Sequence, residues 1–330
     1  MKINVNLKRR HLCLLTLAGA LSLATTSAFA QQDYPNKPIR IVAPFAPGGA
    51  VDILARILSE RLAPVYGQGV IVDNRAGASG HVGAQVVAKS PADGYTLMVG
   101  TIGIHAAYAS YRKLAYSPAT ELQPVMILGE APNLVLVPEN SPYKTFGDFL
   151  ADVKANPGKI NYASAGAGSS VHMVTALFEL TSGARMTHIA YKGSGPALVD
   201  LLGGQVDVMF DNMSSGLPHV KSGKLRVLAV TSPQREPRLP DAPTIAESGV
   251  PGYGGTSWFT LAAPAGMPKA LVDKLSKDVQ SALATPEAVA RYDTLGVNYK
   301  PNTPAEAEAF IKSETVKWNR VIEAANLRLD

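Results

Sequence analysis

The spacing of apolar positions changes sharply around residue 44. Residues 39–43 are apolar apart from Arg40, which is typical of a buried β-strand. After the segment 44–51, which is rich in Pro and Gly, apolar residues recur three and four positions apart, as on one face of an amphipathic helix; these are Ile53, Leu54, Ile57, Leu58 and Leu62. Asp52 stands at the predicted helix start, where the positive end of the helix stabilises a carboxylate. The pattern predicts a strand, a glycine-bearing loop and a helix.

The same alternation returns along the chain. Further strands are predicted at residues 69–74, 95–99, 160–163, 188–191, 206–210, 225–231 and 257–263. Helical spacing follows the loops at 75–80 and 164–170, and Gly183 suits the end of the second of these helices. Pro196 suits the first position of another helix, and Thr303 with Glu306 has the spacing of a capping box. Strands that alternate with helices predict an α/β fold with mainly parallel sheets.

Two segments suggest that the chain crosses twice between two lobes. Apolar runs at 125–128 and 133–137 are split by the segment 129–132, Gly-Glu-Ala-Pro, and residues 232–253 are rich in Pro and Gly. We therefore predict a discontinuous first lobe, residues 31–130 with 252–330, and a continuous second lobe, residues 131–251. A cleft between such lobes, at the carboxyl ends of strands, is a frequent place for a ligand.

The first 30 residues have the pattern of an export signal. Four basic residues precede an apolar run at 12–24, and Ala28-Phe29-Ala30 provides a cleavage pattern. A retained membrane anchor is the alternative, although the run is short for a membrane span. The segment contains Cys13, the one cysteine of the chain, and four of its net five positive charges. The nearly neutral remainder has no basic block for nucleic acid, and export without disulfides is compatible with a bacterial periplasm.

Three predicted loops lead into helix N-termini, where free backbone N–H groups favour an anion. They are residues 47–52, 166–172 and 192–196, the second of which adds the hydroxyls of Ser169 and Ser170. Such short donors suit a carboxylate without a formal cation. Asp211 and Asn212 follow a predicted strand and are candidates to bind a polar or amino group of the same ligand.

Motifs for other chemistry fail at individual positions. Residues 162–166, Tyr-Ala-Ser-Ala-Gly, lack the first glycine of a nucleophile elbow. Residues 77–83 have a G-x-x-G-x-x-G spacing instead of G-x-G-x-x-G, and no Walker lysine follows a loop. The histidines after residue 30 show no metal-ligand spacing, so we predict neither a metal nor a cofactor. A serine hydrolase using Ser164 or Ser169 with His172 remains an alternative.

Many ordered matches make the chain resemble the Bug-type receptors, the extracytoplasmic solute-binding components of tripartite tricarboxylate transporters. The motifs that carry the resemblance are residues 34–40, 44–52, 67–68, 73–80, 93–96, 164–172, 191–193, 196–197, 200–207, 239–244, 247–253 and 263–266. One departure is Ile189-Ala190, where the family more often has Val-Pro before Tyr-Lys-Gly.

The resemblance implies a two-lobed periplasmic binding protein of type II, or Venus-flytrap, architecture that binds a small carboxylate without a catalytic step. Its contacts map onto Phe45, Ala46, Gly49, Ser164, Gly166, Ser169, Ser170, Gly193 and Asp211, with Thr101 in a segment that tunes specificity. The loops add Gly48, Asp52, Gly168, His172 and Lys192. We expect a monomeric receptor that delivers a dicarboxylate, an aromatic acid or an amino acid to membrane transporter subunits. A ligand sensor for a signalling partner is the rival.

Overall fold

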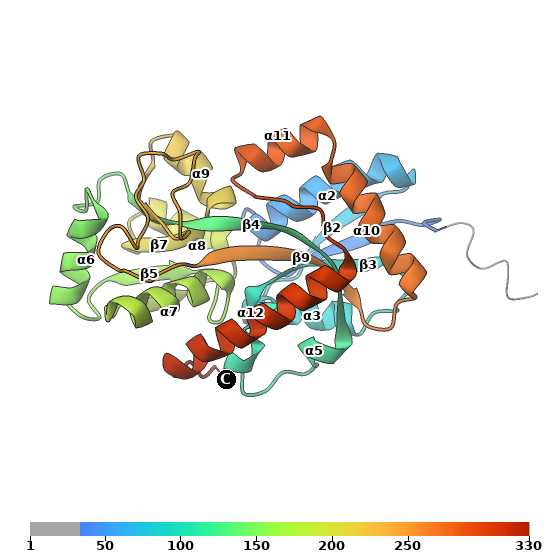
Figure 1. The fold of residues 1–330 in the computed structure, drawn as a ribbon, viewed down its shortest axis with the longest axis horizontal. Coiled ribbons are helices and arrows are strands. Elements are labelled where there is room, and N and C mark those ends of the chain that lie inside the picture. The colour runs from blue at the N-terminus through green and yellow to red at the C-terminus, as the bar shows by residue number, and fades with distance from the viewer. Residues whose placement is uncertain (1–33, 330) are drawn as a thin grey trace, which may run out of the picture. The chain divides into compact units, whose positions relative to one another are not determined.

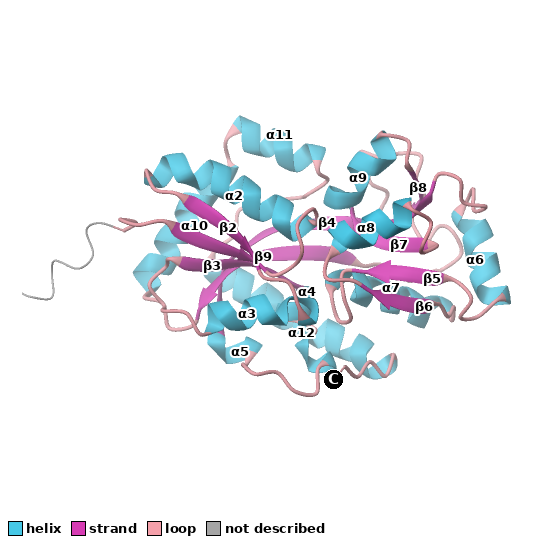
Figure 2. Cartoon of the chain, turned by 180° about the vertical axis from the view of Figure 1, so that it is seen from behind, coloured by secondary structure: helices cyan, strands magenta, loops and turns pink. Residues whose placement is uncertain are grey.

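The computed structural model describes residues 34–329 of the chain. The predicted export signal, residues 1–30, lies outside the described residues. Residues 38–330 form one compact unit, whose described part holds a nine-stranded sheet in the order β2-β1-β3-β9-β4-β7-β5-β6, with β8 paired to β4. Both views place helices α2, α9 and α11 on one side of this sheet and α3, α7 and α12 on the other (Figure 1, Figure 2).

One end of the sheet confirms the predicted strand–loop–helix pattern. Strand β1 (Ile39–Ala43) pairs in parallel with β2 (Val70–Asn74) and with β3 (Thr96–Thr101). Helix α2 (Ala50–Tyr66) follows β1 and buries Leu54, Leu58 and Leu62 against the sheet. Asp52 lies in its first turn and Gly49 is its N-cap. The 3-10 turn η1 (Ala78–Gly80) and helix α3 (His81–Ala88) follow β2.

The middle of the sheet differs from the sequence prediction. The two apolar runs at 125–128 and 133–137 belong to a single strand, β4 (Leu122–Pro138), which pairs antiparallel with β9 (Thr256–Pro264). The register shifts at 124–126 and 127–129, and Gly129 has φ +146°. The segment 129–132 separates the two apolar runs in the sequence but does not end the strand, because irregular pairing absorbs Gly129. The short elements α4 (Ile102–His105), η2 (Tyr108–Ser110) and α5 (Pro118–Glu121) precede β4.

The other end of the sheet repeats the design of the first. Strand β5 (Asn161–Ser164) pairs in parallel with β6 (Thr187–Ala190) and β7 (Val208–Asn212), while β8 (Leu225–Val230) is antiparallel to β4. The sheet is therefore mixed, and parallel pairs lie at both of its ends. The helices here are α6 (Phe146–Ala155), α7 (Ser170–Ser182), α8 (Ser194–Leu202) and α9 (Met213–Lys221).

Helix α8 starts earlier than its proline suggested. Gly193 is the N-cap, so Pro196 occupies the third helical position instead of the first. Proline is tolerated throughout the first turn, because those N–H groups have no partner within the helix. The prediction for α7 is confirmed at both ends: the side chain of Ser169 caps its start, and Gly183, in the left-handed region, ends it.

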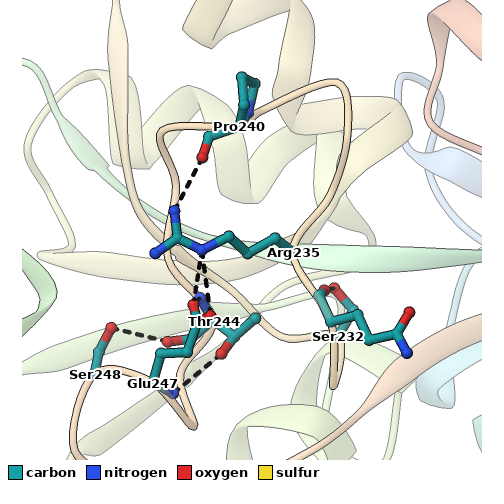
Figure 3. A network of polar contacts seen from close by, with 7 residues as sticks. Ser232, Arg235, Pro240, Thr244, Glu247 and Ser248 are labelled. Carbon is teal, nitrogen blue, oxygen red and sulfur yellow. Dashed lines mark hydrogen bonds and ion pairs between the residues drawn. The ribbon is translucent and has the colours of Figure 1, made fainter.

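The long connection between β8 and β9 is held by polar contacts instead of a helix. Arg235 Nε donates to Glu247 Oε2 at 3.0 Å, and Arg235 Nη1 donates to the carbonyl of Pro240 at 3.1 Å (Figure 3). Thr244 and Glu247 exchange hydrogen bonds, Thr244 N–H to Glu247 Oε2 at 2.9 Å and Glu247 N–H to Thr244 Oγ1 at 3.0 Å. These contacts fix a segment that lacks regular backbone pairing.

Three helices complete the chain: α10 (Lys269–Leu283), α11 (Pro286–Thr294) and α12 (Pro304–Ala324). The predicted capping box of Thr303 and Glu306 opens α12. Trp318 of α12 and Trp258 of β9 are both buried, and both indole N–H groups donate to Glu314 Oε2 at 2.8 Å. This contact fastens the last helix to the central strands. Among the described residues, no helix has the length and apolar character to cross a membrane.

Candidate binding pocket

A pocket lies where the loops after β1, β5 and β6 meet. The ends of β3 and β7 and the middle of β9 supply the rest of its wall. Its lining consists of Phe45, Gly49, Ala50, Val51, Thr101, Ala165, Ser169, Ser170, Val171, Ser194, Asn212 and Phe259.

Three helix N-termini form most of this wall. Gly49, Ala50 and Val51 are the N-cap and first two residues of α2, and residues 169–171 hold the same positions in α7. Ser194 is the first residue of α8. The first N–H groups of a helix have no partner within it and carry the positive end of the helix dipole. The pocket therefore combines several backbone donors suited to an anion.

Three polar side chains of the lining are buried without a hydrogen-bond partner among the described residues: Thr101 Oγ1, Ser170 Oγ and Asn212 Oδ1. A buried polar atom costs free energy unless it is hydrogen-bonded. None of the described residues that line the pocket is a lysine, arginine, histidine, aspartate or glutamate. The recognition groups of the pocket are thus neutral hydroxyl, amide and backbone groups between the apolar walls of Phe45, Phe259, Val51 and Val171.

Asp211 lies behind this wall. It is fully buried; its Oδ1 accepts a hydrogen bond from Ser194 at 2.5 Å, and its Oδ2 accepts one from Ser215 at 2.6 Å. Burial raises the pKa of Asp211 to about 6, although the hydrogen bonds from Ser194, Ser215 and the Asn212 backbone oppose the shift. Asp211 does not line the pocket, so it acts on the pocket through Ser194.

Asp52 has a structural task in the first loop. Its carboxylate accepts hydrogen bonds from Gly48 N–H at 3.1 Å, Arg56 Nε at 3.0 Å and Asn74 Nδ2 at 3.0 Å. Burial alone raises the pKa of Asp52, but these hydrogen bonds outweigh burial and hold it below the ordinary value. Asn74 also donates to the carbonyl of Phe45 at 3.1 Å. The carboxylate therefore shapes the loop that carries Phe45 and Gly49 into the pocket.

The first and third loops touch through their backbones. Ala46 N–H donates to the carbonyl of Lys192 at 2.9 Å. Gly193 has φ +150°, and a Cβ atom added to it would lie 3.0 Å from Ala46 N. A Cβ atom added to Gly195 would lie 2.1 Å from the carbonyl oxygen of Pro47. The contact therefore depends on two glycines, and Lys192 contributes its carbonyl group.

The second loop is held from another direction. The carbonyl of Ala167 accepts hydrogen bonds from Ser79 Oγ and from Tyr111 Oη, the latter at 2.7 Å. Gly166 N–H donates to Ser164 Oγ at 3.0 Å, and Gly168 N–H donates to His172 Nδ1 at 2.9 Å. These bonds shape the loop just before the N-terminus of α7.

The contacts of the histidines differ from the serine–histidine pairing that the hydrolase alternative requires. Ser164 Oγ lies 2.6 Å from Nε2 of His188, not of His172, and Ser164 is fully buried outside the pocket lining. Ser169 Oγ accepts the backbone N–H of His172 as a helix cap. The rings of His172 and His188 stack with centroids 4.1 Å apart. The pairing of Ser164 or Ser169 with the His172 ring was wrong because each group is used to shape the loop.

The structure brings some of the predicted ligand-binding residues into the lining and not others. Phe45, Gly49, Thr101, Ser169 and Ser170 line the pocket. Ala46, Gly48, Asp52, Ser164, Gly166, Gly168, His172, Lys192, Gly193 and Asp211 lie in or beside the same loops, outside the lining.

Asn212, a sequence candidate for contact with a polar or amino group, also lines the pocket. Six lining residues were not predicted as ligand-binding: Ala50, Val51, Ala165, Val171, Ser194 and Phe259. Four of them, Ala50, Val51, Val171 and Ser194, are helix-start residues that the predicted helix positions could have indicated. Phe259 carries no such signal, because it comes from a distant strand.

Comparison with known proteins identifies the family of the chain. The sequence model of the tripartite tricarboxylate transporter family receptor (TctC) matches residues 54–327. The UPF0065 protein in the tcbD-tcbE intergenic region of Pseudomonas sp. (strain P51) is 37% identical over 96% of this chain and 94% of its own. Protein BugT of Bordetella pertussis is 36% identical, with coverage of 90% and 91%.

Three solved structures are similar over nearly their whole length. Rpa4515 of R. palustris with adipate has a TM-score of 0.86 and 38% identity, covering 89% of this chain and 99% of that one. The periplasmic binding protein BugD has a TM-score of 0.85 and 35% identity, covering 89% of this chain and 99% of that one. MatC (Rpa3494) of Rhodopseudomonas palustris with bound malate has a TM-score of 0.83 and 33% identity, covering 88% of this chain and 100% of that one.

The shared fold defines a class, that of the two-lobed periplasmic binding proteins. Within this class, the chain belongs to the tripartite tricarboxylate transporter receptor family, which includes the Bug proteins. This is a family of solute-binding receptors, so the predicted family and fold class are confirmed.

Proposed function

We propose that the protein is a periplasmic receptor that binds a small organic carboxylate in the pocket and delivers it to the membrane subunits of a tripartite transporter. The observation that carries the proposal is the convergence of the N-termini of α2, α7 and α8 on one pocket, where no described lining residue is cationic. Several free N–H groups, with Ser170 and Thr101 hydroxyls, offer a carboxylate the hydrogen bonds that it loses on leaving water.

Two similar structures support the choice of ligand. Rpa4515 is described with adipate and MatC with bound malate, both of them dicarboxylates. The apolar side chains of Phe45, Phe259, Val51 and Val171 also provide room for the carbon skeleton of such an acid. The proposed ligand class comprises dicarboxylates, aromatic acids and amino acids.

The proposal includes the two lobes predicted from sequence, residues 31–130 with 252–330 and residues 131–251. Under this division, the pocket lining comes from both lobes; β4 contains the first crossing, and the second lies in the connection just before β9. Binding stabilises the closed form by the difference in ligand affinity between the closed and open states. Export would proceed with cleavage after Ala30, and the mature receptor would act as a monomer.

A thermal-shift panel on residues 31–330 tests the proposal. It contains C4 to C6 dicarboxylates, citrate, nicotinate, benzoates and amino acids. A ligand at 100 times its Kd adds about 2.7 kcal/mol to the free energy of unfolding, which raises Tm by several degrees at this chain length. Folded, ligand-free protein whose Tm no carboxylate raises would contradict the proposal.

A charge variant locates the binding. Ser170→Asp places a carboxylate at the first position of α7, where the helix dipole stabilises it but where it occupies the proposed anion site. We expect the variant to fold and to lose the ligand-induced shift. Gly147→Asp, which adds the same charge to the exposed first turn of α6, is the control and should keep the shift.

A further inference from the structure

The hydroxyl of Ser194 has a fixed direction in the hydrogen-bond network. Ser194 is 4% exposed, lines the pocket and donates to Asp211 Oδ1 at 2.5 Å. A serine hydroxyl carries one proton and two lone pairs. Because the carboxylate takes that proton, the Ser194 oxygen can offer only its lone pairs to the pocket.

The rest of the network leaves Asp211 no proton of its own to give. Its other oxygen accepts a hydrogen bond from Ser215 Oγ at 2.6 Å, and the backbone N–H of Asn212 also donates to the Asp211 carboxylate. Three donors around one carboxyl group fit the ionised form, which only accepts hydrogen bonds. The negative charge next to Ser194 Oγ makes this oxygen a stronger acceptor.

A second acceptor stands beside this pair. Asn212 follows Asp211 in the chain, lines the pocket and is 5% exposed. Its Oδ1 has no hydrogen-bond partner among the described residues. Among the residues that the structure describes, two buried oxygens at this side of the pocket thus lack a donor, whereas the starts of α2 and α7 present N–H groups without an acceptor inside the helix.

We propose that Ser194, oriented by Asp211, and Asn212 form a specificity subsite that accepts a hydrogen bond from a donor group on the bound acid. This inference rests on the proposed function, since it assumes that the carboxylate binds at the N-termini of α2 and α7. The ligand is then a carboxylate with a hydroxyl or an amino group, and the unsubstituted acid binds more weakly. An analogue that lacks the donor leaves buried acceptors unpaired, which sites of this kind reject strongly.

Matched triples of acids test the inference on residues 31–330. Isothermal titration compares succinate with malate and aspartate, glutarate with 2-hydroxyglutarate and glutamate, and benzoate with 3-hydroxybenzoate and 3-aminobenzoate. In at least one triple we expect the donor-bearing acid to bind tenfold or more tightly than its parent. The hydroxyl and amino members of that triple identify which donor the subsite selects.

Two variants assign this preference to the network. Ser194→Ala removes the acceptor, and the affinity ratio between the donor-bearing acid and its parent should fall toward one. Asp211→Asn keeps the shape but adds an amide donor, which frees the Ser194 proton and should reduce the same ratio. Ser170→Ala, at the carboxylate end of the pocket, is the matched control; it should weaken both acids alike and leave the ratio unchanged.

The outcomes separate the two proposals. If parent acids bind but the donor-bearing acids bind no better in every triple, the subsite is overturned while the receptor function stands. If the ratio is high but survives both Ser194→Ala and Asp211→Asn in folded protein, another part of the pocket selects the donor, which also overturns the subsite. If no acid binds to folded wild-type protein, the proposed function itself fails.

Discussion

The backbone N–H of Ala46 donates a hydrogen bond to the backbone carbonyl of Lys192 at 2.9 Å, which joins the first pocket loop to the third. The two residues belong to different proposed lobes, so we expect this bond to form only when the lobes close on each other. Neither side chain takes part in it. We therefore expect closure to depend on how near the two backbones can come.

Gly195→Ala tests this closure. The added methyl lies 2.1 Å from the Pro47 carbonyl oxygen, which forces the two loops apart. Gly195 is the second residue of α8, where alanine favours the helix itself. We expect an unchanged or higher Tm without ligand but at least tenfold weaker carboxylate binding by isothermal titration. Gly203→Ala, at the end of the same helix, has its nearest contact at 3.4 Å and serves as the control; equal affinities for both variants would contradict the role of the loop contact.

Tyr111→Phe tests the second contact between the proposed lobes. The substitution removes the hydroxyl that donates to the Ala167 carbonyl at 2.7 Å and leaves the ring in place. Loss of one such hydrogen bond costs about 1 kcal/mol, or roughly fivefold in affinity. We expect ligand dissociation to accelerate by that factor in stopped-flow measurements. Tyr108→Phe in the same turn should dissociate at the wild-type rate, and a Tyr111→Phe rate equal to it would exclude a contribution from this bond.

Local patterns predicted the elements well because their signals lie within a few residues. The capping box of Thr303 and Glu306 and the glycine end of α7 at Gly183 need only neighbours in sequence. The continuity of β4 was not predictable in this way. Gly129 indicated a break, but long-range pairing with β9 continues through this point with a register shift, and tertiary context overrides a local signal.

The pocket, too, could be predicted from the sequence only where local signals indicate it. The sequence predicted the loops that carry helix N-termini, because glycine and serine in these loops are local signals. It did not predict that Asp211 is buried behind Ser194, since a polar residue at the end of a strand can face either way. The side chain of Phe259 reaches the pocket from β9, far along the chain. Such placements depend on the packing of distant elements.

Acid should destabilise the protein through its buried histidines. Burial lowers the pKa to about 3 for His172 and to about 4 for His81 and His105. Between pH 6.5 and these values the unfolded chain binds more protons than the folded one, so the free energy of unfolding falls as the pH falls. Asp211 acts in the opposite direction: its pKa of about 6 lets the folded state bind the proton first, so it contributes stability as the pH falls from 6 toward 4.

Two variants separate these contributions in urea unfolding series at pH 7, 6, 5 and 4.5. His172→Asn keeps an acceptor for the Gly168 N–H but cannot take up a proton, so the loss on acidification should shrink by roughly 1.4 kcal/mol per pH unit below pH 6. Asp211→Asn should make the loss steeper below pH 6. Parallel pH profiles for wild type and His172→Asn would show that His172 does not contribute to acid sensitivity.

Glu314 should be an important stabilising residue of the C-terminal helix. Its Oε2 accepts both indole N–H groups, from Trp258 and from Trp318, at 2.8 Å. Glu314→Ala leaves two buried donors without this acceptor, and each unsatisfied buried donor costs about 1–3 kcal/mol. We expect the free energy of unfolding in urea to fall by roughly 2–4 kcal/mol, and Glu314→Gln, which keeps one carbonyl oxygen, to lose less. Glu308→Ala, exposed on the same helix, should change it by less than about 0.5 kcal/mol; a similar loss in Glu308→Ala and Glu314→Ala would refute the indole contact as the source of stability.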